Sequence, residues 1–291
     1  MIRNFLTFDI EEWFHANFHS MPQVDKGLDP QSLERNVNRL LAVCREHNVL
    51  STCFVVGEIA EQYPSLIRKI HAAGHEIAAH SHSHKLLYEL TPQEFIQDLR
   101  QCTRAIEGAV GVRPYGFRAP SWSVNSEILP WYYEGLIQEG YTYSSSIYPA
   151  KTYLFGIEGA DRQIHQPVIH GDTLPIWEIP VPITSIMGKK IGYSGGIFLR
   201  LFPAWFIERV IKSQNRQGIS SFIYLHPREF EPKQVKISLS PLEAFIHYYG
   251  LKTVTRKLQK LIKTLGPTLD VMGQQIGEIN QTKLGKDSKL L

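Results

Sequence analysis

The chain has 291 residues, of which 43% are hydrophobic and 20% are charged, a composition typical of a protein that folds in water. Its formal net charge of +3 is too small to indicate binding to nucleic acid. The three cysteines, Cys44, Cys53 and Cys102, form no Cys-x-x-Cys pair, which argues against a disulfide framework and a thiolate zinc site and favours a reducing compartment.

Neither a leader nor a membrane span is apparent. The N-terminal sequence MIRNFLTFDIEE becomes acidic before an apolar core of secretory length forms, and no stretch approaches about 18 consecutive apolar residues. We therefore expect a cytoplasmic protein without a transmembrane segment. Nothing in the sequence indicates an oligomeric state.

Short apolar runs typical of strands alternate along the chain with amphipathic segments typical of helices. The predicted strands are residues 4–10, 51–57, 75–81, 115–121, 141–147 and 220–227, and the predicted helices are residues 32–48, 63–74, 91–111, 128–140, 204–218 and 251–265. Such alternation predicts a parallel sheet covered by helices, and its repetition favours a barrel over an open sheet. Functional groups are then expected at the carboxyl ends of the strands.

We expect one domain over residues 1–275, followed by a polar C-terminal tail over residues 276–291. The last predicted helix, residues 251–265, has an apolar stripe and an opposite face rich in Lys and Arg. This helix either covers the barrel with its basic face in water or contacts a membrane surface or a partner through that face.

Three carboxylates, Asp9, Glu11 and Glu12, follow the first predicted strand directly. Like charges so close together raise one another's pKa, so a cation, a proton or hydrogen bonds must offset the repulsion. Two histidines, His80 and His84, follow the third predicted strand and converge on one point if the chain turns between them. Two neutral imidazoles and one carboxylate form a common divalent metal site, for which zinc is the first choice and cobalt, manganese and iron remain alternatives.

These segments resemble the motifs of polysaccharide deacetylases, the carbohydrate esterase family 4 with the NodB homology domain. The segment TFDIEEWF resembles the first motif of the family, and HSHSH, FRAPSWS and IYLHP resemble the later ones. The matches follow the family order from residue 7 to residue 229. The stretches WEIPV, YSGGIFLRLFP and LHPREFEP resemble the branch associated with exopolysaccharide export and exosortase systems. The resemblance implies a deformed (β/α) barrel of about seven strands and metal-dependent removal of N-acetyl groups from an amino-sugar glycan.

The resemblance also implies a role for each matching residue. Asp9 is expected to be the general base, His80 and His84 metal ligands, Arg118 the residue that orients the base, and His226 the general acid. A backbone N–H near Ser121 is expected to stabilise the oxyanion.

The first motif departs from the family pattern, because most members have two adjacent aspartates where this chain has Asp9-Ile10-Glu11-Glu12. Residues two apart in a strand point to the same side, so Asp9 and Glu11 share a face. Glu11 is therefore the better candidate for the third metal ligand, and Glu12 is the alternative.

Three further residues are candidates for substrate contact or electrostatic support. Trp13 and Trp122 flank the expected centre and stack on sugar rings or belong to the core. Glu178 either pairs with Arg118 or His226 or lies at a strand end in water. Two other functions are alternatives: hydrolysis of a small non-peptide amide on the same barrel, and binding of a glycan or an export partner without catalysis.

Overall fold

The structure is a computed structural model, and it describes residues 2–18, 29, 31–152 and 155–287. Seven parallel strands form a curled half-barrel in the order β11-β1-β2-β3-β4-β5-β8. Their bounds are β1 Asn4–Ile10, β2 Thr52–Val55, β3 Glu76–Ala79, β4 Gly116–Phe117, β5 Tyr143–Ser144, β8 Trp177–Glu178 and β11 Phe222–Leu225. A short strand, β12 (Leu269–Asp270), pairs with the start of β1. The predicted α/β fold of about seven strands is confirmed.

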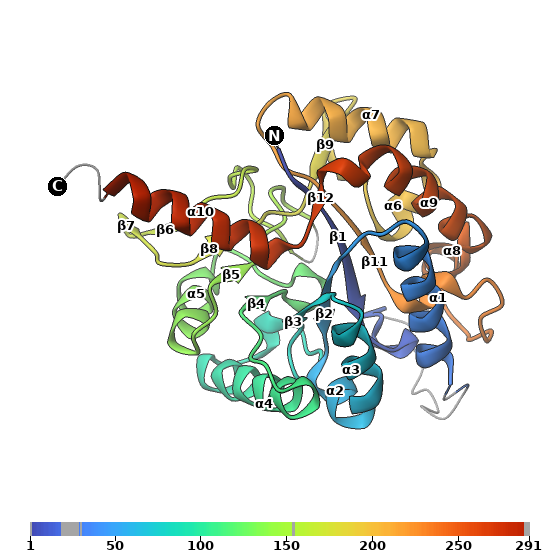
Figure 1. Cartoon of the computed structure of the whole chain (residues 1–291), viewed down its shortest axis with the longest axis horizontal. Coiled ribbons are helices and arrows are strands. Elements are labelled where there is room, and N and C mark those ends of the chain that lie inside the picture. Colours follow the sequence, from blue (N-terminus) through green and yellow to red (C-terminus); the bar gives the residue numbers. More distant parts are fainter. Residues whose placement is uncertain (1, 19–28, 30, 153–154, 288–291) are drawn as a thin grey trace.

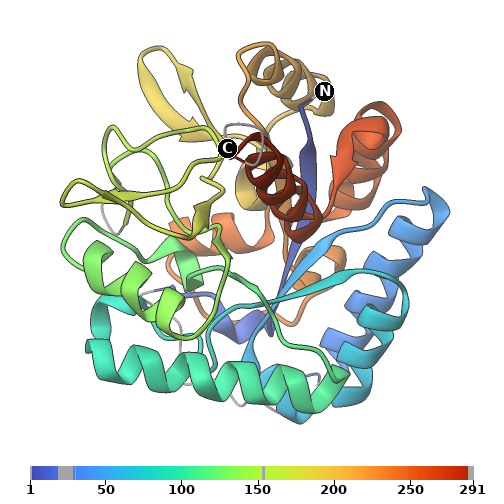
Figure 2. The ribbon, with the colours of Figure 1, turned by 60° about the vertical axis from the view of Figure 1, so that its left-hand side comes forward.

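Most of the helices cover the convex side of the sheet, as Figures 1 and 2 show, whereas the last helix packs Met272 and Ile276 into a cluster on the concave side. Their bounds are α1 Ser32–Glu46, α2 Gly57–Gln62, α3 Pro64–Ala72, α4 Pro92–Val110, α5 Leu129–Gln138, α6 Gly196–Leu201, α7 Ala204–Asn215, α8 Pro241–Tyr248, α9 Val254–Leu265 and α10 Met272–Asp287. Two antiparallel hairpins lie outside the main sheet: β6 (Val168–Ile169) with β7 (Asp172–Thr173), and β9 (Ile183–Ile186) with β10 (Lys189–Gly192). Among the described helices, none is both long and apolar enough to cross a bilayer.

Strand β1 lies in the middle of the sheet and is buried along its whole length. Leu6, Phe8 and Ile10 belong to the core cluster that includes the helices on the convex side. Phe5 belongs to the second cluster, on the concave side, with Phe54 and other residues. Because successive side chains point to opposite faces, Thr7 and Asp9 share the concave side with Phe5. The alternation of β1 therefore aims an acid into the half-barrel.

The chain after Asp270 differs from the predicted tail. Helix α10 runs from Met272 to Asp287, and the side chains of Met272 and Ile276 are buried. The N–H of Gly273 donates to the carboxylate of Glu76, which satisfies one of the free amides at the start of the helix. The capping group comes from a distant strand, so the polar sequence of this segment gave no sign of it. Helix α2, also not predicted, splits the connection between β2 and α3.

At one end of the sheet, an isolated parallel bridge joins Gly195 to Tyr224 of β11. A Cβ added to Gly195 would lie 2.2 Å from the carbonyl oxygen of Tyr224 and 2.2 Å from its ring. The bridge therefore requires glycine at this position.

We expect Gly195→Ala to lower the free energy of unfolding by about 1–3 kcal/mol, because the backbone must move to accept the methyl group. Gly108→Ala is the matched control, since nothing lies within 4 Å of a Cβ at this position in α4. The control should raise stability by about 0.5–1 kcal/mol through helix propensity. Denaturant unfolding of both variants checks the difference, and equal stability of the two would contradict it.

Candidate active site

A buried ion pair lies at the carboxyl end of β1. Arg118 follows β4, and its Nη1 donates to Asp9 Oδ1 at 2.6 Å and to Thr7 Oγ1 at 3.0 Å. The guanidinium is 0% exposed and lies over the ring of Phe54, 3.9 Å from its centroid. Ser145 accepts from the remaining nitrogens of Arg118. The donors of this arginine are thus arranged to fix one carboxylate oxygen of Asp9.

The predicted metal-ligating residues come together beside this pair. The ligand atoms of Glu11, His80 and His84 all lie within 4.8 Å of one another, and all three residues are buried. Glu11 Oε2 is 2.7 Å from His84 Nε2 and 3.7 Å from His80 Nε2. The chain turns between the two histidines through positive φ angles at Ser81 and His84, and Asp98 accepts from the N–H groups within the turn.

The arrangement of these side chains fits a divalent cation. His80 Nδ1 lies 2.8 Å from the carbonyl oxygen of Arg118, which accepts its proton and leaves Nε2 as the free ligand atom. His84 Nε2 is buried and faces Glu11 Oε2 at 2.7 Å. Two imidazole nitrogens and one carboxylate, buried and facing one another in this way, form a set of ligand atoms that zinc and related metals prefer.

The structure separates the two glutamates that the sequence left as alternatives. Glu12 turns away from the imidazoles and accepts from the hydroxyl of Tyr63 at 3.4 Å. Burial raises the pKa of Glu12 to about 7. Burial alone would also raise the pKa of Glu11, but the nearby imidazoles of His84 and His226 bring it well below its usual value. Glu11, and not Glu12, faces the two histidines.

His226 follows β11 and completes the group. Its Nε2 lies 3.9 Å from Asp9 Oδ2 and 3.8 Å from Glu11 Oε1. On its other side, Nδ1 lies 3.1 Å from Glu229 Oε2. Burial opposes protonation of the ring, but Glu11 and Glu229 outweigh it and raise the pKa of His226. The imidazole is therefore held between Glu229 on one side and Asp9 and Glu11, at the end of β1, on the other.

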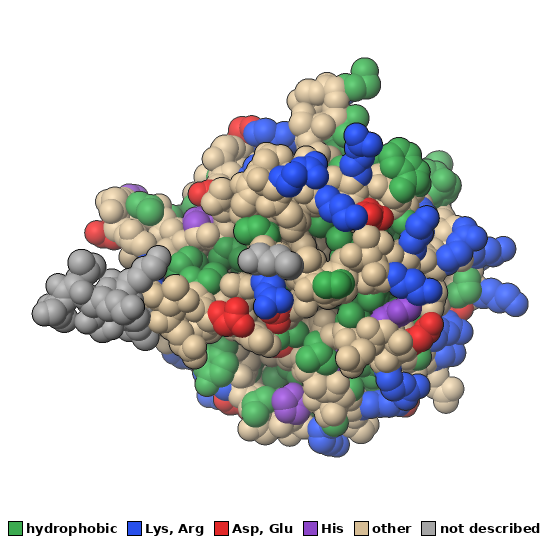
Figure 3. Space-filling model, turned by 45° about the horizontal axis from the view of Figure 1, so that its top comes forward, with side chains coloured by type: hydrophobic (Ala, Val, Ile, Leu, Met, Phe, Trp, Pro, Cys, Tyr) green, Lys and Arg blue, Asp and Glu red, His purple; other side chains and the backbone are tan. Residues whose placement is uncertain are grey.

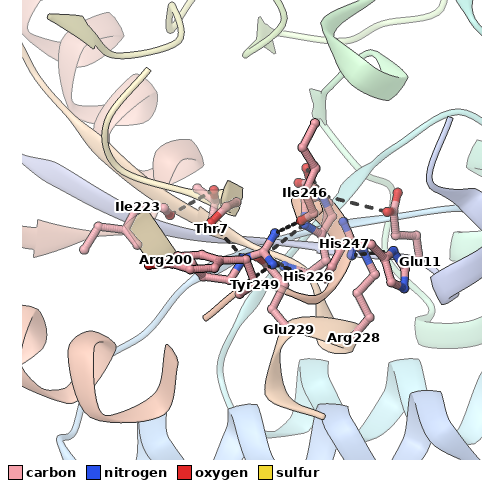
Figure 4. A network of polar contacts seen from close by, with 12 residues as sticks. Thr7, Glu11, Arg200, Ile223, His226, Arg228, Glu229, Ile246, His247 and Tyr249 are labelled. Atoms are coloured by element: carbon pink, nitrogen blue, oxygen red, sulfur yellow. Dashed lines mark hydrogen bonds and ion pairs between the residues drawn. The ribbon is translucent and has the colours of Figure 1, made fainter. Parts of the chain in front are cut away.

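Two residues of this network were not predicted from the sequence. Arg200, which is 2% exposed, brings Nε to 3.0 Å from Glu229 Oε1, and its other nitrogens donate to the carbonyl groups of Ile246, His247 and Tyr249 (Figure 4). Burial raises the pKa of Glu229, whereas Arg200 and His226 lower it, and the result is about 2. The sequence offered one indication of Glu229 as a partner of His226, because it stands three residues after this histidine at a strand end. It offered none for Arg200.

A cavity of about 1150 Å³ opens over these groups. Its lining includes Asp9, Glu11, His80, His84 and His226, together with Ser121 and Trp122. Ser121 has a φ of +50°, and its Oγ accepts from Asn17 Nδ2 at 2.9 Å. The ring of Trp122 meets that of Tyr224 edge to face at 4.6 Å.

Two predicted residues lie elsewhere. Trp13 lines a smaller neighbouring pocket behind Glu11 and Glu12 and does not line the large cavity. Glu178 accepts from the backbone N–H groups of Ser146 and Ile147 and from the hydroxyl of Tyr133. Its carboxylate stabilises the loop after β5, and no ion pair joins it to Arg118 or His226 among the described contacts.

Asp9 lies near the carboxyl end of β1, and Glu11, His80, Arg118 and His226 follow the carboxyl ends of β1, β3, β4 and β11, where α/β enzymes bind their substrates. Residues 6–134 match the family model of polysaccharide deacetylase, and residues 145–266 match a domain of unknown function, DUF3473. The chain therefore carries a domain of the polysaccharide deacetylase family, with the NodB-type fold.

Individual relatives agree with this assignment. Chitin deacetylase 1 of Cryptococcus neoformans var. grubii is 30% identical over 89 residues, which are 31% of this chain and 19% of that protein. Peptidoglycan-N-acetylglucosamine deacetylase of Bacillus cereus is 28% identical over 93 residues, 32% of this chain and 34% of that protein. The chain thus spans about a third or less of these curated relatives. A Mycobacterium smegmatis structure assigned as a polysaccharide deacetylase has a TM-score of 0.65 at 20% identity, covering 96% of this chain and 90% of that one.

The network around Arg228 predicts a pH dependence of stability. His247 is buried, and its Nδ1 accepts from Arg228 Nη1 at 3.2 Å. Burial is the main cause that lowers the pKa of His247 to about 3; Arg228, Arg200 and Lys236 add to the effect and Glu229 opposes it. An unfolded histidine has a pKa of about 6.5, so the unfolded state gains a proton first as the pH falls.

We therefore expect the contribution of His247 to the free energy of unfolding to be fully present above about pH 6.5 and to decrease as the pH falls toward 3. His247→Gln keeps an acceptor for Arg228 but does not titrate. Between pH 7 and pH 5, the wild type should lose on the order of 1–2 kcal/mol more than this variant. Urea unfolding at the two pH values checks the difference, and parallel losses would rule out His247 as the cause.

Proposed function

We propose that the chain is a metal-dependent hydrolase that removes N-acetyl groups from an amino-sugar polysaccharide, in the synthesis or modification of an exopolysaccharide. The observation that carries the proposal is the convergence at the wall of one cavity of Asp9, which Arg118 holds from behind, of Glu11 with two histidines, and of His226. A domain that only binds glycan has no need for a base, its positioning arginine and an acid together.

Glu11, His80 and His84 would hold the cation, with zinc as the first choice and cobalt, manganese or iron as alternatives. When bound, a divalent metal lowers the pKa of a coordinated water and polarises the acetyl carbonyl. A hydrogen bond outside the metal site orients one of these ligands, because the carbonyl of Arg118 fixes the orientation of the His80 ring.

The remaining residues of the site are placed to accept and donate protons. Arg118 fixes Asp9 Oδ1, so Oδ2 lies on the side of His226, where it can accept the proton of the attacking water. His226, whose pKa is raised by Glu11 and Glu229 against the effect of burial, can donate a proton to the leaving amine. The backbone N–H near Ser121 and the ring of Trp122 are the proposed contacts to the oxyanion and to the sugar.

The proposed substrate class rests on the names of the relatives and on the size of the cavity. The named relatives act on chitin and on peptidoglycan, both of which carry N-acetylglucosamine. A cavity of about 1150 Å³ exceeds what a small amide needs and accommodates sugar residues on both sides of the reacting group.

We expect the purified chain to release acetate from N-acetylglucosamine oligomers, and a chelator to stop the release. An acetate assay over a panel of N-acetyl glycans and small amides, with metal analysis of the same sample, checks this. Full activity of metal-free protein would contradict metal dependence. Release from small amides alone would support the small-amide hydrolase instead, and no release from any substrate by metal-loaded protein would support a binding domain.

The two glutamates provide a matched pair of variants. Glu11→Gln should weaken metal binding by at least about tenfold, because a ligand in contact with both histidines loses its charge. Glu12→Gln should bind metal as the wild type does, since this side chain contacts Tyr63 instead. Titration with Zn²⁺ in the absence of substrate measures both, and the reverse order of affinities would place Glu12 on the metal.

A further inference from the structure

Helices α6, α7 and α8, which lie beside α9 in Figure 1, carry exposed apolar side chains. Leu201 is 40% exposed at the end of α6, and Trp205 is 60% exposed in the first turn of α7. Helix α8 adds Leu242, Phe245 and the adjoining Tyr249, with exposed fractions of 68%, 44% and 44%. We call these five residues the α6–α9 corner. Large apolar side chains gathered in this way on a folded protein indicate a contact surface.

Two basic residues join the helices at this corner. Lys257, in α9, donates from Nζ to the carbonyl groups of Leu199, Arg200 and Phe202, where α6 ends. Arg200 in turn donates to the carbonyls at the end of α8. These bonds join α9 to α6 and α6 to α8, and α7 packs against α9. Lys257 belongs to the predicted helix 251–265, whose Lys and Arg were expected on one exposed face, but its Nζ is bound within this contact between helices.

The charge around the corner is strongly basic. Residues 189–263, all of which the structure describes, contain 14 of the 31 Lys and Arg but only four of the 28 Asp and Glu. None of these four acids is exposed, because Glu229 and Glu231 are buried and Glu208 and Glu243 are half-buried. The exposed basic residues of this segment are Lys189, Lys190, Arg209, Lys212, Arg216, Lys233, Lys236, Lys252, Arg256, Lys260 and Lys263, of which Lys190 pairs with Glu158 and Lys212 with Glu208. Figure 3 shows Lys and Arg gathered along one side of the molecule, with hydrophobic side chains beside them.

We propose that the α6–α9 corner docks on the surface of an anionic lipid bilayer. Basic side chains are attracted to anionic headgroups, and Trp, Phe, Tyr and Leu side chains insert at the boundary between headgroups and acyl chains. An anionic polymer would satisfy the charges but would leave Leu201 and Trp205 in water. The combination of exposed apolar and basic residues therefore favours a bilayer over a polyanion.

Docking at this corner brings the large cavity close to the bilayer. Helix α8 contributes Glu243 and Ile246 to the lining of that cavity, and α6 contributes Gly196. The same helix α8 thus carries the exposed apolar residues and part of the cavity wall. The docking itself does not depend on the proposed hydrolysis.

Sedimentation of the full chain with vesicles tests the proposal without an activity assay. We expect binding to vesicles of phosphatidylcholine with phosphatidylglycerol, weak binding to phosphatidylcholine alone, and loss of binding at high salt. Replacing Leu201 and Trp205 together by Ser should reduce binding at least about tenfold. The matched control replaces Val112 and Tyr115, which are 46% and 56% exposed before β4, and should leave binding unchanged.

Charge reversal provides an independent readout. Arg256→Glu, at an exposed position of α9, should reduce binding roughly fivefold or more, whereas Arg104→Glu, at an exposed position of α4, should have little effect. Equal losses from the two reversals would overturn the proposal. Failure to bind anionic vesicles would also overturn it, and binding to heparin without binding to vesicles would identify the surface as a polyanion site instead.

Discussion

The buried contact between Arg118 and Asp9 organises the rest of the site. Taking a guanidinium fully out of water is unfavourable unless its donors and its charge are satisfied. Here Asp9, Thr7 and Ser145 accept from it, and the rings of the inner core lie against its faces. The backbone carbonyl of the same residue orients His80. One arginine thus positions both the candidate base and one of the candidate metal ligands.

A second buried arginine plays a parallel part for His226. Arg200 pairs with Glu229, which holds the imidazole at Nδ1. Asp9, Glu11, the two histidines and Arg118 all lie within residues 6–134, the deacetylase match, whereas Arg200, His226 and Glu229 lie within residues 145–266, the domain of unknown function. The site is therefore complete only where the two matched segments meet across β1 and β11, which pair in parallel.

The sequence predicted what depends on local pattern. The run NFLTFDI predicts β1 with its exact bounds, and strand alternation alone selects Glu11 over Glu12 as the neighbour of the imidazoles. It could not predict what depends on contacts between distant segments. From the sequence, Glu178 is an acid at the end of a strand, and nothing near it indicates a partner. In the structure, the backbone N–H groups of the loop after β5 donate to its carboxylate. Trp13 stands two residues after Glu11, the candidate metal ligand, yet the short helix that begins at Trp13 carries it into the neighbouring pocket.

Arg200 also connects the candidate active site with the surface of the molecule. Its Nε lies against Glu229, behind His226, while its other nitrogens hold the carbonyl end of α8. A cation at that position is favoured by the partial negative charge of the helix C-terminus as well as by the carboxylate. Any displacement of α8 therefore weakens contacts of the residue that supports His226. The position of the candidate acid is in this way tied to the helix that carries Leu242, Phe245 and the wall of the cavity.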